Sequence, residues 1–170
     1  MILGIDASNI RAGGGVTHLI ELLRAANPAE QGFSRVIVWS GQATLKQIED
    51  RPWLVKRTEP VLEKHFIQRA LWQRRSLGLR AKVEHCDVLF VPGGSFETDF
   101  RPIITMSRNL LPFEWRELMR YGVSVLGLKL ALLRWSQSRS FRQANGMIFL
   151  TRYAQDAVSK VTGTLSGQTT

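Results

Sequence analysis

Short apolar runs alternate with amphipathic stretches along this chain. The strongest runs are nearly continuous in apolar character, which is typical of strands buried on both faces of a parallel sheet. A weaker run at residues 53–58 indicates an edge strand. Buried strands are predicted at residues 2–7, 35–39, 87–91, 102–107 and 146–151.

Helical spacing separates these strands. Val16, Leu19, Ile20 and Leu23 fall on one face of a predicted helix, and Asn27-Pro28 ends it. Helices are predicted at residues 16–26, 43–50, 63–85, 113–120, 123–144 and 153–161, with an interruption of the third near Gly78.

The alternation of strands and helices predicts an α/β fold. We expect a Rossmann-like, three-layer domain over residues 1–162, in which a parallel sheet carries helices on both faces. The Gly/Ser/Thr-rich tail at residues 163–170 is predicted to begin an interdomain linker.

Composition narrows the possible partners. The 170 residues include 23 Lys and Arg against 14 Asp and Glu, a net charge of +9. This balance favours an anionic partner, such as nucleotide phosphates or an acidic membrane surface, but solvated helix faces would explain it equally well. Nucleic acid is not expected, because neither an aromatic RNA-binding pattern nor a helix-turn-helix signature occurs.

The cysteine count and the hydropathy indicate a cytoplasmic location. Cys86 is the only cysteine, which excludes an intrachain disulfide and a Cys-based zinc site. No signal peptide and no apolar run of spanning length are found. Peripheral attachment of the protein to a membrane is an alternative. The basic stretches 65–82 and 129–142 would suit either an anionic membrane or the solvent-facing side of a helix.

The glycine triplet after the first strand is the main candidate for ligand chemistry. Gly13, Gly14 and Gly15 precede a helix, whose free N–H groups attract phosphate, and Arg11 adds charge. The motif is an incomplete GxGxxG, since His18 stands at its last position, and it lacks the Lys of a Walker A loop. A plain flexible turn is the alternative, and His18 either faces the ligand or packs on the sheet.

Further candidates follow other strands. Arg108 and Asn109 come directly after the strand at residues 102–107, where parallel sheets bind ligands, although a capping loop with Asn109 bonded to local backbone explains them as well. Asp6 ends the first strand, where a capping or salt-bridged Asp is common. The three histidines lack metal-binding spacing, so no metal is predicted.

Taken in order, these segments resemble the N-terminal domain of GT-B glycosyltransferases, specifically the retaining group called glycosyltransferase family 4. The ordered set is more specific than any one motif in it, and it covers nearly the whole chain. The matching stretches are residues 4–8 with 13–18, then 87–94, 107–113 and 148–154.

The resemblance implies transfer of a sugar, with retention, from a nucleotide-sugar to a saccharide or lipid-linked acceptor, and no cofactor or obligatory metal. The Gly-rich turn would contact the donor diphosphate. Arg108 stands where the family usually has His, which puts a catalytic role for Arg108 and Asn109 in doubt. The acceptor-side candidates are Arg11, His18, Gly94, Glu114 and Thr151.

The resemblance also implies that most of the donor is held by a C-terminal domain that should follow residue 170. Without that domain we expect this chain to be inactive. A non-catalytic α/β module that binds a nucleotide or a glycan is the alternative function.

Overall fold

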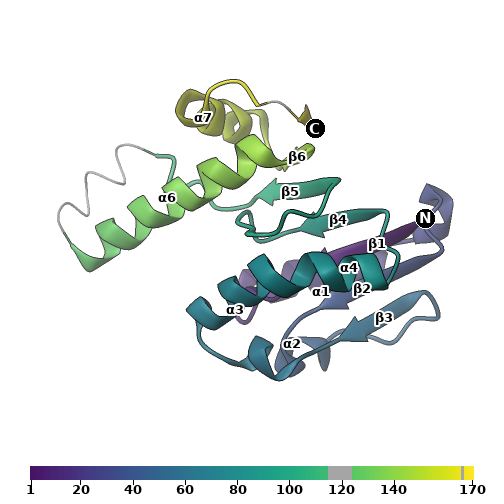
Figure 1. The fold of residues 1–170 in the computed structure, drawn as a ribbon. Coiled ribbons are helices and arrows are strands. Elements are labelled where there is room, and N and C mark those ends of the chain that lie inside the picture. Colours follow the sequence, from purple (N-terminus) through teal and green to yellow (C-terminus); the bar gives the residue numbers. More distant parts are fainter. Residues whose placement is uncertain (115–123, 166) are drawn as a thin grey trace.

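The computed structural model describes residues 1–114, 124–165 and 167–170. Its centre is a seven-stranded sheet in which every neighbouring pair is parallel, in the order β3-β2-β1-β4-β5-β6-β7 (Figure 1). The strands are β1 Ile2–Asp6, β2 Arg35–Trp39, β3 Leu54–Arg57, β4 Val88–Val91, β5 Ile103–Ser107, β6 Gly146–Phe149 and β7 Gln168–Thr169.

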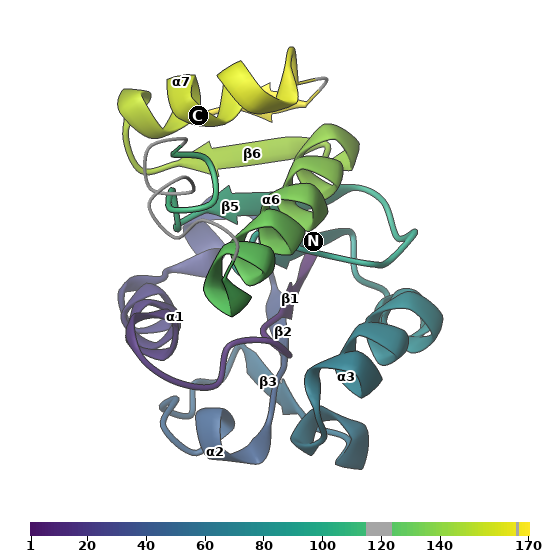
Figure 2. The same ribbon diagram turned by 90° about the vertical axis from the view of Figure 1, so that its left-hand side faces the viewer.

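Helices lie on both faces of this sheet. One face carries α1, and the other carries α3 with α4 and, beside them, α6 (Figure 2). The predicted three-layer α/β fold is therefore confirmed. The helical segments are α1 Gly14–Ala25, η1 Pro28–Gln31, α2 Gln42–Leu45, η2 Pro60–Glu63, α3 Phe66–Trp72, η3 Gln73–Leu77, α4 Gly78–Val83, α6 Val125–Gln143 and α7 Arg152–Thr162.

The hydrophobic core is split by the sheet into two clusters. In β2, Ile37 and Trp39 belong to one cluster, whereas Val36 and Val38 belong to the other. Because successive side chains of a strand point to opposite faces, burial on both faces requires an uninterrupted apolar run. This requirement explains why the central strands were recognisable in the sequence.

The long basic helix is correctly predicted as interrupted near Gly78, but it differs in form. It begins at Phe66, and a π-helical turn at Gln73–Leu77 joins α3 to α4. A Cβ on Gly78 would lie 2.9 Å from Asp99 Oδ1. The glycine therefore allows the helix to approach the loop that follows β4.

Three other predicted elements need comment. The helix expected at residues 43–50 ends at Leu45. The helix expected at 113–120 lies mostly outside the described residues, and Phe113 is in a turn. In the tail expected to be a linker, β7 pairs with β6 through Gln168 and Thr169; whether the tail leads into a second domain stays a prediction.

Beside α1, part of the sheet is covered by none of the described helices (Figure 2). An apolar groove of about 470 Å³ lies there, lined from the sheet by Phe90, Ile104, Met106 and Ile148 among others. None of the helices in the described parts of the chain has the length and apolar character needed to cross a bilayer.

Candidate functional site

The strand order places a topological switch point between β1 and β4. The chain winds outward from β1 to β2 and β3 on one side, and from β4 to β5 and β6 on the other. In open parallel sheets, ligands bind in the crevice at the carboxyl ends of the strands beside such a point. The loop after β1, which contains the glycine triplet, and the loop after β4 meet this description.

The glycine triplet forms the start of α1. Gly13 is the N-cap residue with φ +68°, a conformation that side chains rarely adopt, and α1 begins at Gly14. Helix geometry provides no acceptor for the N–H groups of Gly14 and Gly15, whereas the Val16 N–H donates to the Gly13 carbonyl at 3.0 Å. A Cβ built on Gly13 or Gly14 would meet no atom within 4 Å, so the turn borders open space.

Arg108 lies against this turn, although 93 residues separate it from Gly15. A Cβ on Gly15 would lie 3.3 Å from one terminal guanidinium nitrogen of Arg108 and 3.4 Å from the other, and the Gly15 carbonyl is 3.5 Å from that side chain. Among the described residues no carboxylate forms an ion pair with Arg108, and burial lowers the pKa of its guanidinium. A half-buried positive charge that pairs with none of the described carboxylates is a favourable place for an anion.

The loop between β1 and the triplet is fixed by polar contacts from other elements. Arg11 donates to the carbonyls of Leu62 and Lys64 and to the Glu63 carboxylate, at 3.0 to 3.2 Å. Arg11 was predicted as an acceptor-side candidate, but here its guanidinium is engaged by η2 and the residue after it.

Two further contacts complete the fixation of that loop. Arg69 donates from Nε to Asn9 Oδ1 at 3.2 Å, and the Thr44 hydroxyl donates to the Ile10 carbonyl at 2.9 Å. Arg69 is buried, which lowers its pKa together with repulsion from Arg11. Arg69, which belongs to the basic stretch, therefore has a structural role. Together these contacts fix the position of the glycine turn without a ligand.

Asp6 is a buried carboxyl at the end of β1. It accepts from the Ser8 backbone N–H at 3.0 Å and from the side-chain amide of Gln73, the first residue of the π-helical turn. Burial raises the pKa of Asp6, and the hydrogen bonds from Ser8 and Gln73 oppose that rise. The carboxyl therefore links the loop after β1 to the interrupted helix, at the cost of burying a charge.

Substitution of Asp6 by Asn should change the pH dependence of stability. Because the pKa is raised on folding, the folded protein binds more protons than the unfolded chain, and stability falls as pH rises from the ordinary Asp range through the folded pKa. Asn still accepts from Ser8, and the Gln73 amide can turn to accept from Asn. In urea denaturation across a pH series, Asp6→Asn should match or exceed the parent at pH 7, and this advantage should shrink towards pH 4.

The control for that prediction is Asp6→Ala, which removes both acceptors. The Ser8 N–H and the Gln73 amide would then lack a partner, and we expect a loss of about 1–3 kcal/mol. A difference between parent and Asp6→Asn that stayed constant across the pH series would contradict the assignment.

Several buried polar atoms near the carboxyl edge have no hydrogen-bond partner in the described part of the chain. Such atoms are rare in native proteins and often mark the place of a water, an ion or a ligand. Each comes from the end of a strand, from a loop after a strand or from the first turns of α1. They are Ser8 Oγ, His18 Nε2, Ser95 Oγ, Ser107 Oγ and Arg108 Nε.

The other predicted candidates make contacts within the fold. Asn109 accepts from the Leu111 N–H at 3.1 Å, as in the capping loop that was the alternative. Thr151 caps α7 by accepting from the Ala154 N–H at 3.1 Å. Glu114 accepts from the Tyr153 hydroxyl.

Gly94 serves a close approach between the loop after β4 and α6. It has φ +81°, and a Cβ there would lie 2.8 Å from Nε2 of Gln137. His18, in contrast, is half-buried in α1, and its Nε2 atom is buried with no hydrogen-bond partner among the described residues. The structure therefore brings Gly13–Gly15 and Arg108 together, with His18 in the next turn of α1.

Sequence reasoning did not single out Gln73, Arg69 or Ser107 for this region. Gln73 is a neutral residue inside a basic stretch, and Ser107 ends an apolar strand, so each gave a weak signal. Arg69 looked like one of several solvated Arg side chains. The positions of Gln73 and Arg69 depend on the packing of α3 and η3 against the end of β1 and the loop after it, whereas Ser107 is placed by the pairing of β5 with β6.

In the described parts of the chain, no group of three or more His, Cys, Asp and Glu side chains is placed to hold a metal ion. Comparison with known protein families gave no matching family model, and comparison with curated proteins gave no matching sequence.

Proposed function

We propose that this chain is the acceptor-side domain of a glycosyltransferase and binds the diphosphate of a nucleotide-sugar at the Gly13–Gly15 turn. In this proposal a second domain holds the rest of the donor. The acceptor, a saccharide or a lipid-linked saccharide, approaches over the carboxyl edge of the sheet. The proposal rests first on the sequence resemblance to GT-B N-terminal domains.

One structural observation carries the proposal further: the Arg108 guanidinium lies at the start of α1, and none of the described carboxylates pairs with it. A helix N-terminus has the equivalent of about half a positive charge, and its free N–H groups point at an incoming anion. The Arg guanidinium supplies paired donors that match phosphate oxygens. When the sugar is transferred, the leaving nucleoside diphosphate gains charge, and fixed donors of this kind stabilise it.

The presence of Arg instead of the family's usual His supports a second candidate function. A guanidinium binds anions well but stays protonated, so it does not serve as a general base. A module that binds a nucleotide or a glycan without catalysis would need only the binding part of this site. The two functions share the phosphate contact and differ in whether sugar is transferred once a donor domain is supplied.

Titration with a nucleoside diphosphate tests the shared contact. In two-dimensional NMR of the whole chain, we expect the amide signals of Gly14 and Gly15 to shift progressively, because their N–H groups belong to the start of α1 and have no helical acceptor. Inorganic sulfate should compete. Unchanged signals in this turn at millimolar ligand would contradict both functions, whereas shifts without sugar transfer in the presence of a donor domain would favour the binding module.

A further inference from the structure

The exposed side of α6 changes character along its length. Its outermost positions recur at intervals of three and four residues, so they form one stripe along the helix. The first four are apolar, with 59–75% of each residue exposed, and the last two are basic. In chain order the stripe is Val125, Leu128, Leu132, Trp135, Arg139 and Arg142.

The apolar part of this stripe is exposed, and none of the described elements covers it. The N-terminal half of α6 extends past the carboxyl ends of β4 and β5 (Figure 1). Leu126 is also 45% exposed there. Single exposed apolar residues are ordinary, but a contiguous group on a projecting helix marks a surface that meets something other than water.

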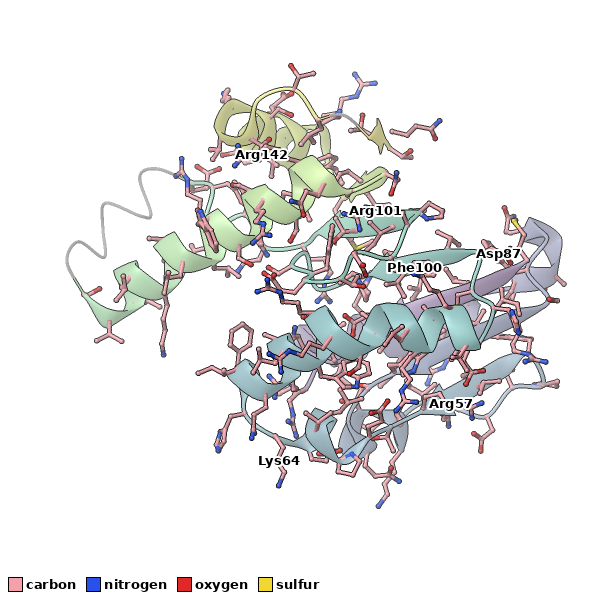
Figure 3. The ribbon with its side chains drawn as sticks, viewed as in Figure 1. Arg57, Lys64, Asp87, Phe100, Arg101 and Arg142 are labelled. Atoms are coloured by element: carbon pink, nitrogen blue, oxygen red, sulfur yellow. The ribbon has the colours of Figure 1, made fainter. Side chains whose placement is uncertain are left out.

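Charge indicates what that surface meets. Lys129 lies among the apolar positions, and Arg139 stacks over the Trp135 ring, with its guanidinium carbon 6.0 Å from the ring centre. Arg142 stands near the other end of the helix (Figure 3). α6 contains no Asp or Glu, so the same helix of a second copy would offer no counter-charge.

A second helix begins at the same edge with similar residues. Phe66 and Ile67, in the first turn of α3, are 63% and 71% exposed, and Lys64 precedes them (Figure 3). Since α3 and α6 cover the same face of the sheet (Figure 2), both present apolar first turns and nearby basic side chains at the carboxyl edge.

We propose that α6, assisted by the start of α3, docks the protein on an anionic lipid bilayer. The apolar first turns of α6 enter the boundary between headgroups and acyl chains, Trp135 lies at the interface, and Arg139 and Arg142 contact the headgroups. The helix lies on the bilayer and does not span it. This docking does not depend on the proposed function, although it would hold the carboxyl edge next to lipid-linked molecules.

Vesicle flotation of the whole chain tests the proposal. We expect the protein to float with vesicles of phosphatidylcholine and phosphatidylglycerol at low salt, to bind less as salt rises, and to stay unbound with phosphatidylcholine alone. Leu128→Ser and Leu132→Ser should each weaken binding about tenfold, since each removes an apolar side chain that enters the bilayer when the protein docks. Arg139→Gln and Arg142→Gln should each weaken it about fivefold.

Val83→Ser is the matched control, because Val83 is 72% exposed but ends α4, away from the carboxyl edge. This variant should bind vesicles as the parent does. Absence of flotation, equal binding to neutral vesicles, or full binding by the Leu128 and Leu132 variants would overturn the proposal. A dimer in sedimentation that dissociates in Leu128→Ser would also overturn it, by assigning the stripe to a second copy.

Discussion

Arg108→Gln should weaken the binding of a nucleoside diphosphate by about 10- to 150-fold, the range expected for the loss of hydrogen bonds to a charged group. The expectation follows from the position of the guanidinium, which lies beside Gly15 at the start of α1 and has no acidic partner among the described residues. Isothermal titration calorimetry of the whole chain measures the affinity. Arg108→Lys keeps the charge but loses the paired donors, so its affinity should fall between those of the parent and Arg108→Gln.

Thermal unfolding separates this effect from a loss of the fold. Because Arg108 is half-buried and this burial lowers its pKa, replacing it with a neutral side chain should not lower the melting temperature. Arg24→Gln is the charge-matched control, since Arg24 ends the same helix, pairs with Glu21 at 2.7 Å and is well exposed. Retention of full affinity in Arg108→Gln would remove this side chain from the phosphate site.

Phe141→Ala should destabilise the protein by about 3–5 kcal/mol, through lost burial and the cavity that remains. The Phe141 side chain is fully buried, and its ring stacks on that of Phe113 with 5.7 Å between the centroids. The pair joins α6 to the turn that follows Arg108. Since typical domains are stable by about 5–15 kcal/mol, a loss of this size should be evident in urea denaturation.

Leu132→Ala is the control on the same helix. Leu132 is 59% exposed, so its truncation should change the free energy of unfolding by no more than about 0.5 kcal/mol. Equal losses in the two variants would mean that α6 is not docked through Phe141. A loss in Phe141→Ala accompanied by weaker diphosphate binding in the folded fraction would show that this contact also positions Arg108.

The polar contacts around the loop after β1 could not be predicted from the sequence. Arg11, Arg69 and Arg108 are chemically alike and looked equally able to meet a ligand or solvent. Arg11 and Arg69 form hydrogen bonds that fix the loop. Arg108 lies beside the glycine turn, and none of the described carboxylates pairs with it. A long side chain finds its partner among whatever the fold brings near, so local sequence does not determine its role.

The class of fold and the location of the glycine turn could be predicted from the sequence alone. Apolar periodicity is a local property that follows from burial on one or two faces, so the central strands and α1 could be predicted from it. Four features were visible only in the folded structure. They are the order of the strands, the addition of β7, the π-helical turn that contains Gln73, and the contact between Gly15 and Arg108. These features arise from packing between segments that are distant in the sequence. Because the free energy of that packing depends on several segments at once, no single stretch of the chain predicts it.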